Sequence, residues 1–151
     1  MVSLIVSLLL FWTRPVDGRV VKPFVAPATR FGPGHRGVDF AARPGTPVRA
    51  AGPGIVVFAG TIAHKRYVVI LHRGNLRTSY SYLRTIKIRR GQRVREGQVI
   101  ATTSGTSLHF GLRLGPDYED PMTLFATGPP DLPAVVHLVP VTYRHAQFTV
   151  S

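Results

Sequence analysis

Short apolar runs separated by glycine or proline dominate the chain between Arg19 and Phe125. The runs are rich in Val, Ile, Phe, Tyr and Thr and recur about every eight to twelve residues, which is typical of an all-β domain. Apolar residues at helical spacing are absent from this region, so no helix is predicted there. The pattern predicts strands over residues 54–62, 66–72, 76–83, 85–88, 98–103 and 108–114.

Two local features refine these predicted strands. The segment HRGN lies between the second and the third run, and its Gly74 and Asn75 tolerate the positive φ angles of a hairpin turn. In the third run Tyr80 and Tyr82 alternate with serines, so we expect both tyrosines on the same side of the strand. There they either line a groove or pack in the core.

The two ends of the chain differ from its centre. Val2 to Trp12 is almost wholly apolar but shorter than the roughly 20 residues of a membrane-spanning helix. Its length fits a signal peptide cleaved before Arg19, although the usual basic start is missing; an anchor, an upstream start and a buried helix are the alternatives. We expect a signal peptide or short anchor over 1–18, one β domain over 19–127, and a Pro-rich break with a tail over 128–151.

The chain is strongly basic. It has 19 Lys and Arg against 7 Asp and Glu, a net charge of +12, which calls for an anionic environment: nucleic acid, a phospholipid surface or a polyanionic cell wall. No basic arm, zinc-finger spacing or aromatic-interleaved RNA motif is present, which argues against nucleic acid. Because the chain has no cysteine, any metal must be held by His, Asp or Glu.

Three residues are candidate metal ligands. His35 and Asp39 stand four positions apart, roughly 13 Å on an extended strand, and Gly37 between them permits a bend that would bring them together. His109 lies in a predicted strand between two apolar residues, so its side chain projects to the opposite face. Two histidines and a carboxylate with one open position compose a catalytic zinc site. Taken alone, the pair His35 and Asp39 fits surface residues better, and so does His109.

Three stretches, GHRGVDFAARPGTPVRAAGPGIVVFAG, VVILHRGNLRTSYSYL and RRGQRVREGQVIATTSGTSLHFGLR, carry a family resemblance. Together they resemble the M23 family of peptidoglycan-cleaving metallopeptidases, of the LytM or lysostaphin type, over Phe31 to Phe125. The order of five motifs makes the resemblance specific. It implies an all-β, mainly antiparallel sheet or sandwich of the duplicated hybrid motif type, with a Zn²⁺ site in an open groove.

The resemblance also assigns residues. In the family the H-x-x-x-D pair and the second histidine of H-x-H bind zinc, which gives His35, Asp39 and His109. Tyr82 and Ser107 stand where the family has its two non-ligand catalytic histidines. Loss of a general base typically costs about 10²–10⁴ in rate and loss of an oxyanion donor about 10²–10³. A tyrosine hydroxyl can donate a hydrogen bond but is a poor base at neutral pH.

The sequence therefore supports an exported zinc metalloendopeptidase that acts on peptidoglycan cross-links with reduced activity. We expect it in the cell wall, outside the cell, or anchored in the membrane through residues 2–12, with peptidoglycan or another anionic wall polymer as partner and no nucleic acid. The alternative is an inactive M23 module that binds the wall or regulates another hydrolase. A lipoyl-like carrier module is a third reading, but no lysine stands at a convincing hairpin tip. The remaining histidines are expected at the surface: His64, His72, His137 and His145.

Overall fold

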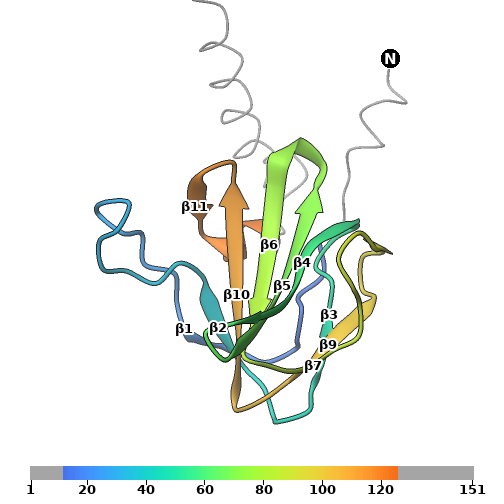
Figure 1. Cartoon of the computed structure of the whole chain (residues 1–151). Coiled ribbons are helices and arrows are strands. Elements are labelled where there is room, and N and C mark those ends of the chain that lie inside the picture. The colour runs from blue at the N-terminus through green and yellow to red at the C-terminus, as the bar shows by residue number, and fades with distance from the viewer. Residues whose placement is uncertain (1–11, 126–151) are drawn as a thin grey trace, which may run out of the picture.

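Two antiparallel β-sheets make up the part of the chain that the computed structural model describes, residues 12–125 (Figure 1). The larger sheet contains, in spatial order, β1 Val20–Lys22, β2 Val38–Ala41, β10 Ser107–Leu114, β6 Leu76–Ser81, β5 Lys65–His72, β4 Gly54–Ile62 and β8 Arg93–Val94, with β11 Asp117–Glu119 beside β10. The smaller sheet has the order β3 Pro47–Arg49, β9 Val99–Thr103 and β7 Leu83–Ile86. The 3₁₀ turns η1 Arg73–Asn75 and η2 Pro121–Phe125 complete the described elements.

The predicted fold class is confirmed, because residues 12–125 contain strands and 3₁₀ turns but no α-helix. Neither 3₁₀ turn among these residues is long enough to span a membrane. The HRGN turn is confirmed as well, with φ of 75° at Gly74 and 59° at Asn75. One predicted strand is wrong. The run 76–83 breaks at Tyr82, whose φ of 65° is left-handed, and the chain passes there from the larger to the smaller sheet.

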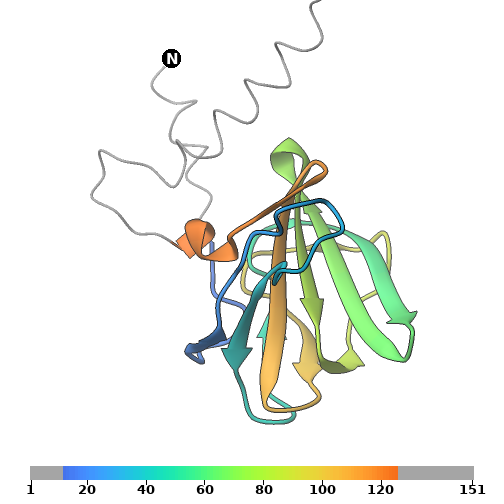
Figure 2. The same cartoon turned by 90° about the vertical axis from the view of Figure 1, so that its left-hand side faces the viewer.

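The strand β10 lies inside the larger sheet, between β2 and β6 (Figure 2). The side chains of β10 alternate between faces, and Leu108, Phe110 and Leu112 are fully buried on the inner face. The outer face carries His109, which lies directly opposite Asp39 on β2 and opposite Ser81 on β6. Because opposed residues of an antiparallel pair share a face, this register places all three side chains on the same side of the sheet.

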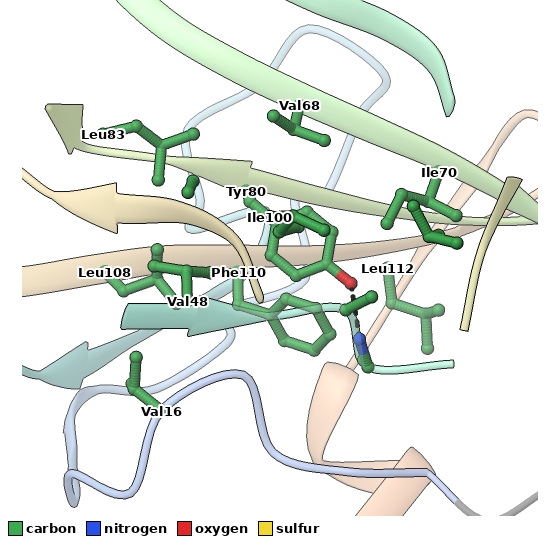
Figure 3. Packing of buried hydrophobic residues seen from close by; sticks show 14 of the residues in the cluster. Val16, Val48, Val68, Ile70, Tyr80, Leu83, Ile100, Leu108, Phe110 and Leu112 are labelled. Carbon is green, nitrogen blue, oxygen red and sulfur yellow. Dashed lines mark hydrogen bonds between the residues drawn. The ribbon is translucent and has the colours of Figure 1, made fainter. Parts of the chain in front are cut away.

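The core lies between the two sheets, and it contains one of the two tyrosines that were expected either to line a groove or to pack in the core. Tyr80 is fully buried and packs on Phe110, so it belongs to the core, on the face opposite the neighbouring serines (Figure 3). Its hydroxyl accepts the Ala51 N–H at 2.8 Å and shares a 3.0 Å hydrogen bond with Thr78. The left-handed backbone at Tyr82 breaks the strand alternation, and the expectation that both tyrosines face one side is wrong.

The expectation of a surface position is also wrong for His72, which is buried. Its Nδ1 lies 2.6 Å from the carbonyl of Pro53, and its Nε2 lies 2.7 Å from the hydroxyl of Thr78. The Nδ1–H therefore donates to the carbonyl, and Nε2 accepts from the hydroxyl. Burial lowers the pKa of His72, an effect that the Pro53 carbonyl partly offsets. His64 is exposed, as expected, and the other two histidines lie outside the described residues.

The segment formed by residues 12–18 packs against both sheets, ahead of the expected domain start at Arg19. Val16 is 1% exposed and belongs to the core cluster. The backbone of the segment is held at two points, because Thr13 donates to the Ala51 carbonyl and Pro15 accepts from the Arg49 N–H.

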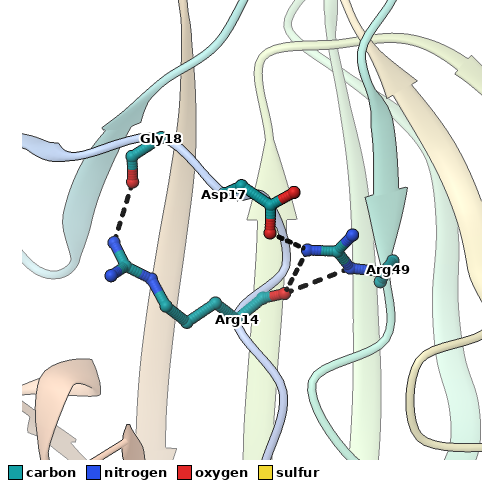
Figure 4. Close-up of polar contacts among 4 residues, drawn as sticks. All are labelled: Arg14, Asp17, Gly18 and Arg49. Atoms are coloured by element: carbon teal, nitrogen blue, oxygen red, sulfur yellow. Dashed lines mark hydrogen bonds and ion pairs between the residues drawn. The ribbon is translucent and has the colours of Figure 1, made fainter.

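Side chains add a second set of contacts to this segment (Figure 4). The guanidinium of Arg14 donates to the Gly18 carbonyl, and that of Arg49 donates to the Arg14 carbonyl. An ion pair joins Arg49 to Asp17 at 2.6 Å. Since the Asp17 side chain is 90% exposed, that pair stabilises the fold by about 0–1 kcal/mol at most. The start of the β domain at Arg19 stays a prediction. Because Val16 packs in the core, a substitution at Val16 can test it.

Candidate metal centre

The three predicted ligands come together on the outer face of the larger sheet. The Nε2 of His35 lies 3.2 Å from Oδ1 of Asp39, and the Nδ1 of His109 lies 2.7 Å from the same oxygen. All three ligand atoms are within 4.8 Å of one another. The ligands of a tetrahedral Zn²⁺ at 2.0–2.2 Å stand roughly 3.3 Å apart, so this donor set fits the ion in both chemistry and spacing.

The orientation of His35 is fixed by the segment that follows β1. The Nδ1 of His35 lies 2.8 Å from the Pro23 carbonyl and therefore carries the proton, which leaves the Nε2 lone pair directed at the site. His35 also exchanges two backbone hydrogen bonds with Val25, of 3.0 and 2.9 Å, in an isolated bridge. The register between β2 and β10 fixes the other two ligands, and residues from three separate segments thus define the site.

Gly37 is required here for a reason that the sequence did not reveal. A Cβ at this position would lie 2.8 Å from Cε1 and Nε2 of His109 and 2.4 Å from the Phe110 carbonyl. A side chain at residue 37 would therefore displace the imidazole. The sequence suggested a bend at Gly37; the structure shows a close approach between the H-x-x-x-D segment and β10.

Tyr82 and Ser107 stand at the edge of the metal site. The ring of Tyr82 is 5.8 Å from that of His109, and the residue is 36% exposed. Partial burial raises the pKa of the Tyr82 hydroxyl, and the charges of Asp39 and Tyr67 raise it further. This hydroxyl is therefore a protonated hydrogen-bond donor at neutral pH. Ser107 opposes Ala41 and shares the outer face with His109 by strand alternation.

Sequence reasoning missed two residues of this face, Ser81 and Tyr67. Ser81 lies directly opposite His109 and is 4% exposed; Tyr67 is the next residue in the same cross-strand row. Neither has a motif of its own, since only the register between β10, β6 and β5 brings them to the site.

A hollow elsewhere on the described surface contains none of the candidate ligands. It is lined by Val16, Asp17, Gly18, Ala41, Ala42, Arg43, Thr46 and Thr106. The chemistry-bearing residues lie instead on the open outer face.

Comparison with known proteins agrees with this geometry. A model of the group described as "Peptidase family M23" matches residues 33–121, a stretch that begins just before His35 and contains His109. The chain belongs to peptidase family M23. Peptidases of this family depend on zinc, and His35, Asp39 and His109 form a group that could hold a metal ion.

Two curated proteins are similar to this chain in sequence. The uncharacterized protein Rv2891 of Mycobacterium tuberculosis is 39% identical over 130 residues, which cover 78% of this chain and 52% of that protein. The murein hydrolase activator NlpD of Escherichia coli is 33% identical over 109 residues, 68% of this chain and 28% of NlpD. The chain thus spans about half, or less, of the curated relatives that it matches.

A solved structure, the crystal structure of a zinc-containing peptidase from Vibrio cholerae, shares the fold with a TM-score of 0.65 and 29% identity. The alignment covers 80% of this chain and 41% of that one. Membership of M23 therefore rests on both sequence and fold, and it supports a hydrolase of the peptidase type.

Proposed function

We propose that this M23 domain is an exported zinc metalloendopeptidase that hydrolyses peptide cross-links of bacterial peptidoglycan. The observation that carries the proposal is the convergence of His35, Asp39 and His109. Within residues 12–125 no fourth His, Cys, Asp or Glu joins this group. A structural zinc site normally has four protein ligands, whereas three ligands with an open position are typical of a catalytic one.

The chemistry divides between the ion and the side chains. Zn²⁺ bound by the three ligands would polarise the scissile carbonyl and lower the pKa of a water at the open position. Tyr82 would donate its hydroxyl proton as a hydrogen bond to the oxygen on which negative charge develops. Its raised pKa makes it unsuited to the role of base. The site therefore retains a set of metal ligands and a hydrogen-bond donor but has no histidine base at Tyr82 or Ser107, which supports a reduced rate.

The proposed partner is an anionic polymer of the cell wall. Six cations between residues 84 and 95 are exposed, with Glu96 as the adjoining acid: Arg84, Lys87, Arg89, Arg90, Arg93 and Arg95. This stretch and the net charge of +12 favour attraction to a polyanion. An outward-facing location is supported by relatives of the cell envelope, among them the Escherichia coli lipoprotein YgeR, which is 35% identical over 118 residues. Residues 2–12, for which a membrane anchor is one alternative, lie outside the described residues except for Trp12.

A second candidate function is supported by the same two substitutions. NlpD is named as an activator of a murein hydrolase, and an M23 domain that lacks both non-ligand histidines could bind the wall and act on another hydrolase without cutting. The retained ligand set favours the enzyme, since a binding module has no evident need of it.

The test is release of soluble fragments from purified peptidoglycan by the zinc-loaded full chain. The variant His109→Ala removes a ligand, and His64→Ala is the matched control because His64 is exposed and is not one of the three ligands. We expect release by the parent and the control, and none by His109→Ala, which should also lose bound zinc. Zinc-loaded parent protein that releases nothing above His109→Ala would contradict the enzyme and leave the regulator.

The contribution of Tyr82 is tested separately. Tyr82→Phe should lower the rate by about 10²-fold or more while the zinc content stays unchanged, since only the donor hydroxyl is lost. An unchanged rate would remove Tyr82 from the proposed chemistry without affecting the metal site.

A further inference from the structure

Two arginines lie directly opposite each other on the outer face of the larger sheet. Arg113 on β10 pairs with Arg77 on β6, and each stands between buried residues of its strand, so both project outward. Opposed side chains have Cβ atoms about 4.5–5.5 Å apart, and like charges at this separation destabilise a sheet. The two guanidinium groups therefore start from adjacent backbone positions, and an anion bound between them would offset their repulsion.

The two arginines share their strands and their face with the metal site. The register runs from the pair His109 and Ser81, through Gly111 and Ser79, to Arg113 and Arg77. Four residues along a strand span roughly 13 Å. Gly111 is buried, and the Arg36 carbonyl lies 3.3 Å from the place that a Cβ would take there, whereas Ser79 on β6 is half-buried. An extended chain from the metal site to the arginines would therefore follow β6 over Ser79.

The contacts of the two arginines leave capacity for a ligand. Arg77 donates to the side-chain carbonyl of Asn75 at 3.0 Å, a neutral partner, and Arg113 lies over the ring of Tyr118, 5.3 Å from its centroid. The acidic residues that flank Tyr118 on β11 are opposed to Leu112 and Leu114, whose side chains face the core. On the outer face, the described cross-strand rows of β2, β10, β6 and β5 contain one carboxylate, Asp39, at the other end.

A third arginine connects this pair to the metal ligands. Arg36 follows His35, and its guanidinium lies 5.6 Å from the Tyr118 ring on which Arg113 also packs. Arg36 is committed to the loop before it, because its Nη2 donates to the carbonyls of Arg30 and Gly32, each at 3.0 Å. Tyr118 thus places Arg113 beside the segment that carries His35.

We propose that Arg77 and Arg113 bind a free carboxylate of the peptide substrate, about four residues from the bond that lies at the metal site. The proposal rests on the proposed peptidase function and adds the substrate class: extended peptides with a carboxylate at that spacing. Guanidinium groups suit this role because they bind carboxylates with two parallel hydrogen bonds. The bound anion also offsets the repulsion within the pair.

The experiment measures binding, so that it does not depend on hydrolysis. The probes are soluble stem peptides released from peptidoglycan, with carboxyl groups free or amidated, titrated into the zinc-loaded full chain by calorimetry. The double variant Arg77→Gln with Arg113→Gln is compared with a control double variant, Arg19→Gln with Arg43→Gln, which removes two exposed charges elsewhere. Zinc content and the urea midpoint verify that each variant is folded. Because Arg77 and Arg113 repel each other, their replacement should leave the urea midpoint unchanged or raise it.

We expect the free-carboxyl peptides to bind the double variant about tenfold more weakly than the control. Amidated peptides should bind both variants equally and the parent more weakly than the free acids do. Equal affinity of the double variant and the control, equal affinity for acid and amide, or no binding at all would overturn the proposal. Displacement by inorganic phosphate as effectively as by the free acids would reveal a general anion site, and would overturn it too. Failed hydrolysis with the expected binding pattern would contradict the proposed function alone.

Discussion

The segment of residues 12–18 allows a quantitative test of where the folded unit begins. Val16→Ala removes two methyl groups from a side chain that is 1% exposed. At about 0.8 kcal/mol per buried methyl or methylene group, the transfer free energy lost is about 1.6 kcal/mol, and the cavity left behind brings the total to about 2 kcal/mol. Val21 is the matched control, since it is 45% exposed and the same change there should cost less than about 0.5 kcal/mol.

The assay is equilibrium unfolding in urea. With an m-value of about 2 kcal/mol per M, Val16→Ala should lower the midpoint by about 1 M and leave the slope unchanged. Removal of all residues before Arg19 would in addition eliminate the Thr13 and Pro15 backbone hydrogen bonds, at about 1 kcal/mol each. That total of about 4 kcal/mol is close to the lower end of the stability of small domains, about 5–15 kcal/mol. If Val16→Ala shifts the midpoint no more than Val21→Ala, residues 12–18 are not part of the folding unit.

Three further predictions concern close contacts. Gly37→Ala should weaken zinc binding about 10–100-fold, because its Cβ would displace the imidazole of His109, whereas Gly105→Ala, with open space around its Cβ, should not; competition with a chromogenic chelator measures both. Burial lowers the pKa of His72 below 6.5, so as the pH falls the unfolded chain takes up a proton on this histidine before the folded chain does. The urea midpoint should therefore fall as the pH drops below about 6.5, and it should fall less steeply in His72→Gln. Tyr80→Phe removes the hydroxyl that accepts a buried backbone N–H and should cost about 1–3 kcal/mol in the same assay; no loss would mean that another group satisfies that N–H.

Much of the fold could be predicted because each strand carries its own pattern. The runs at 54–62 and 98–103 became β4 and β9 within one residue, and the turn at Gly74 and Asn75 formed as its residues indicated. The short edge strands β1, β3 and β8 have two or three residues each and no internal pattern, so they depend on their neighbours in the sheet.

The site was predictable in composition but not in detail. The spacing of His35 and Asp39 and the isolated His109 suggested a shared ion, and the structure brings their ligand atoms together, although that they hold zinc stays a proposal. The partners Ser81 and Tyr67 could not be found, because they are adjacent only through strand register. Tyr82 was misplaced because a left-handed residue inside a β-like run leaves no trace in the pattern.

The direct hydrogen-bonded pairing of β2 with β10 has a consequence for metal loading. Asp39 and His109 are 70 residues apart in the chain but opposite each other in the sheet. A shift of one residue in this register would turn His109 toward the core, and the three ligands would no longer lie together. The unfolded chain should therefore bind zinc far more weakly than the folded domain. During refolding, zinc uptake measured at successive times would report when β2 pairs with β10.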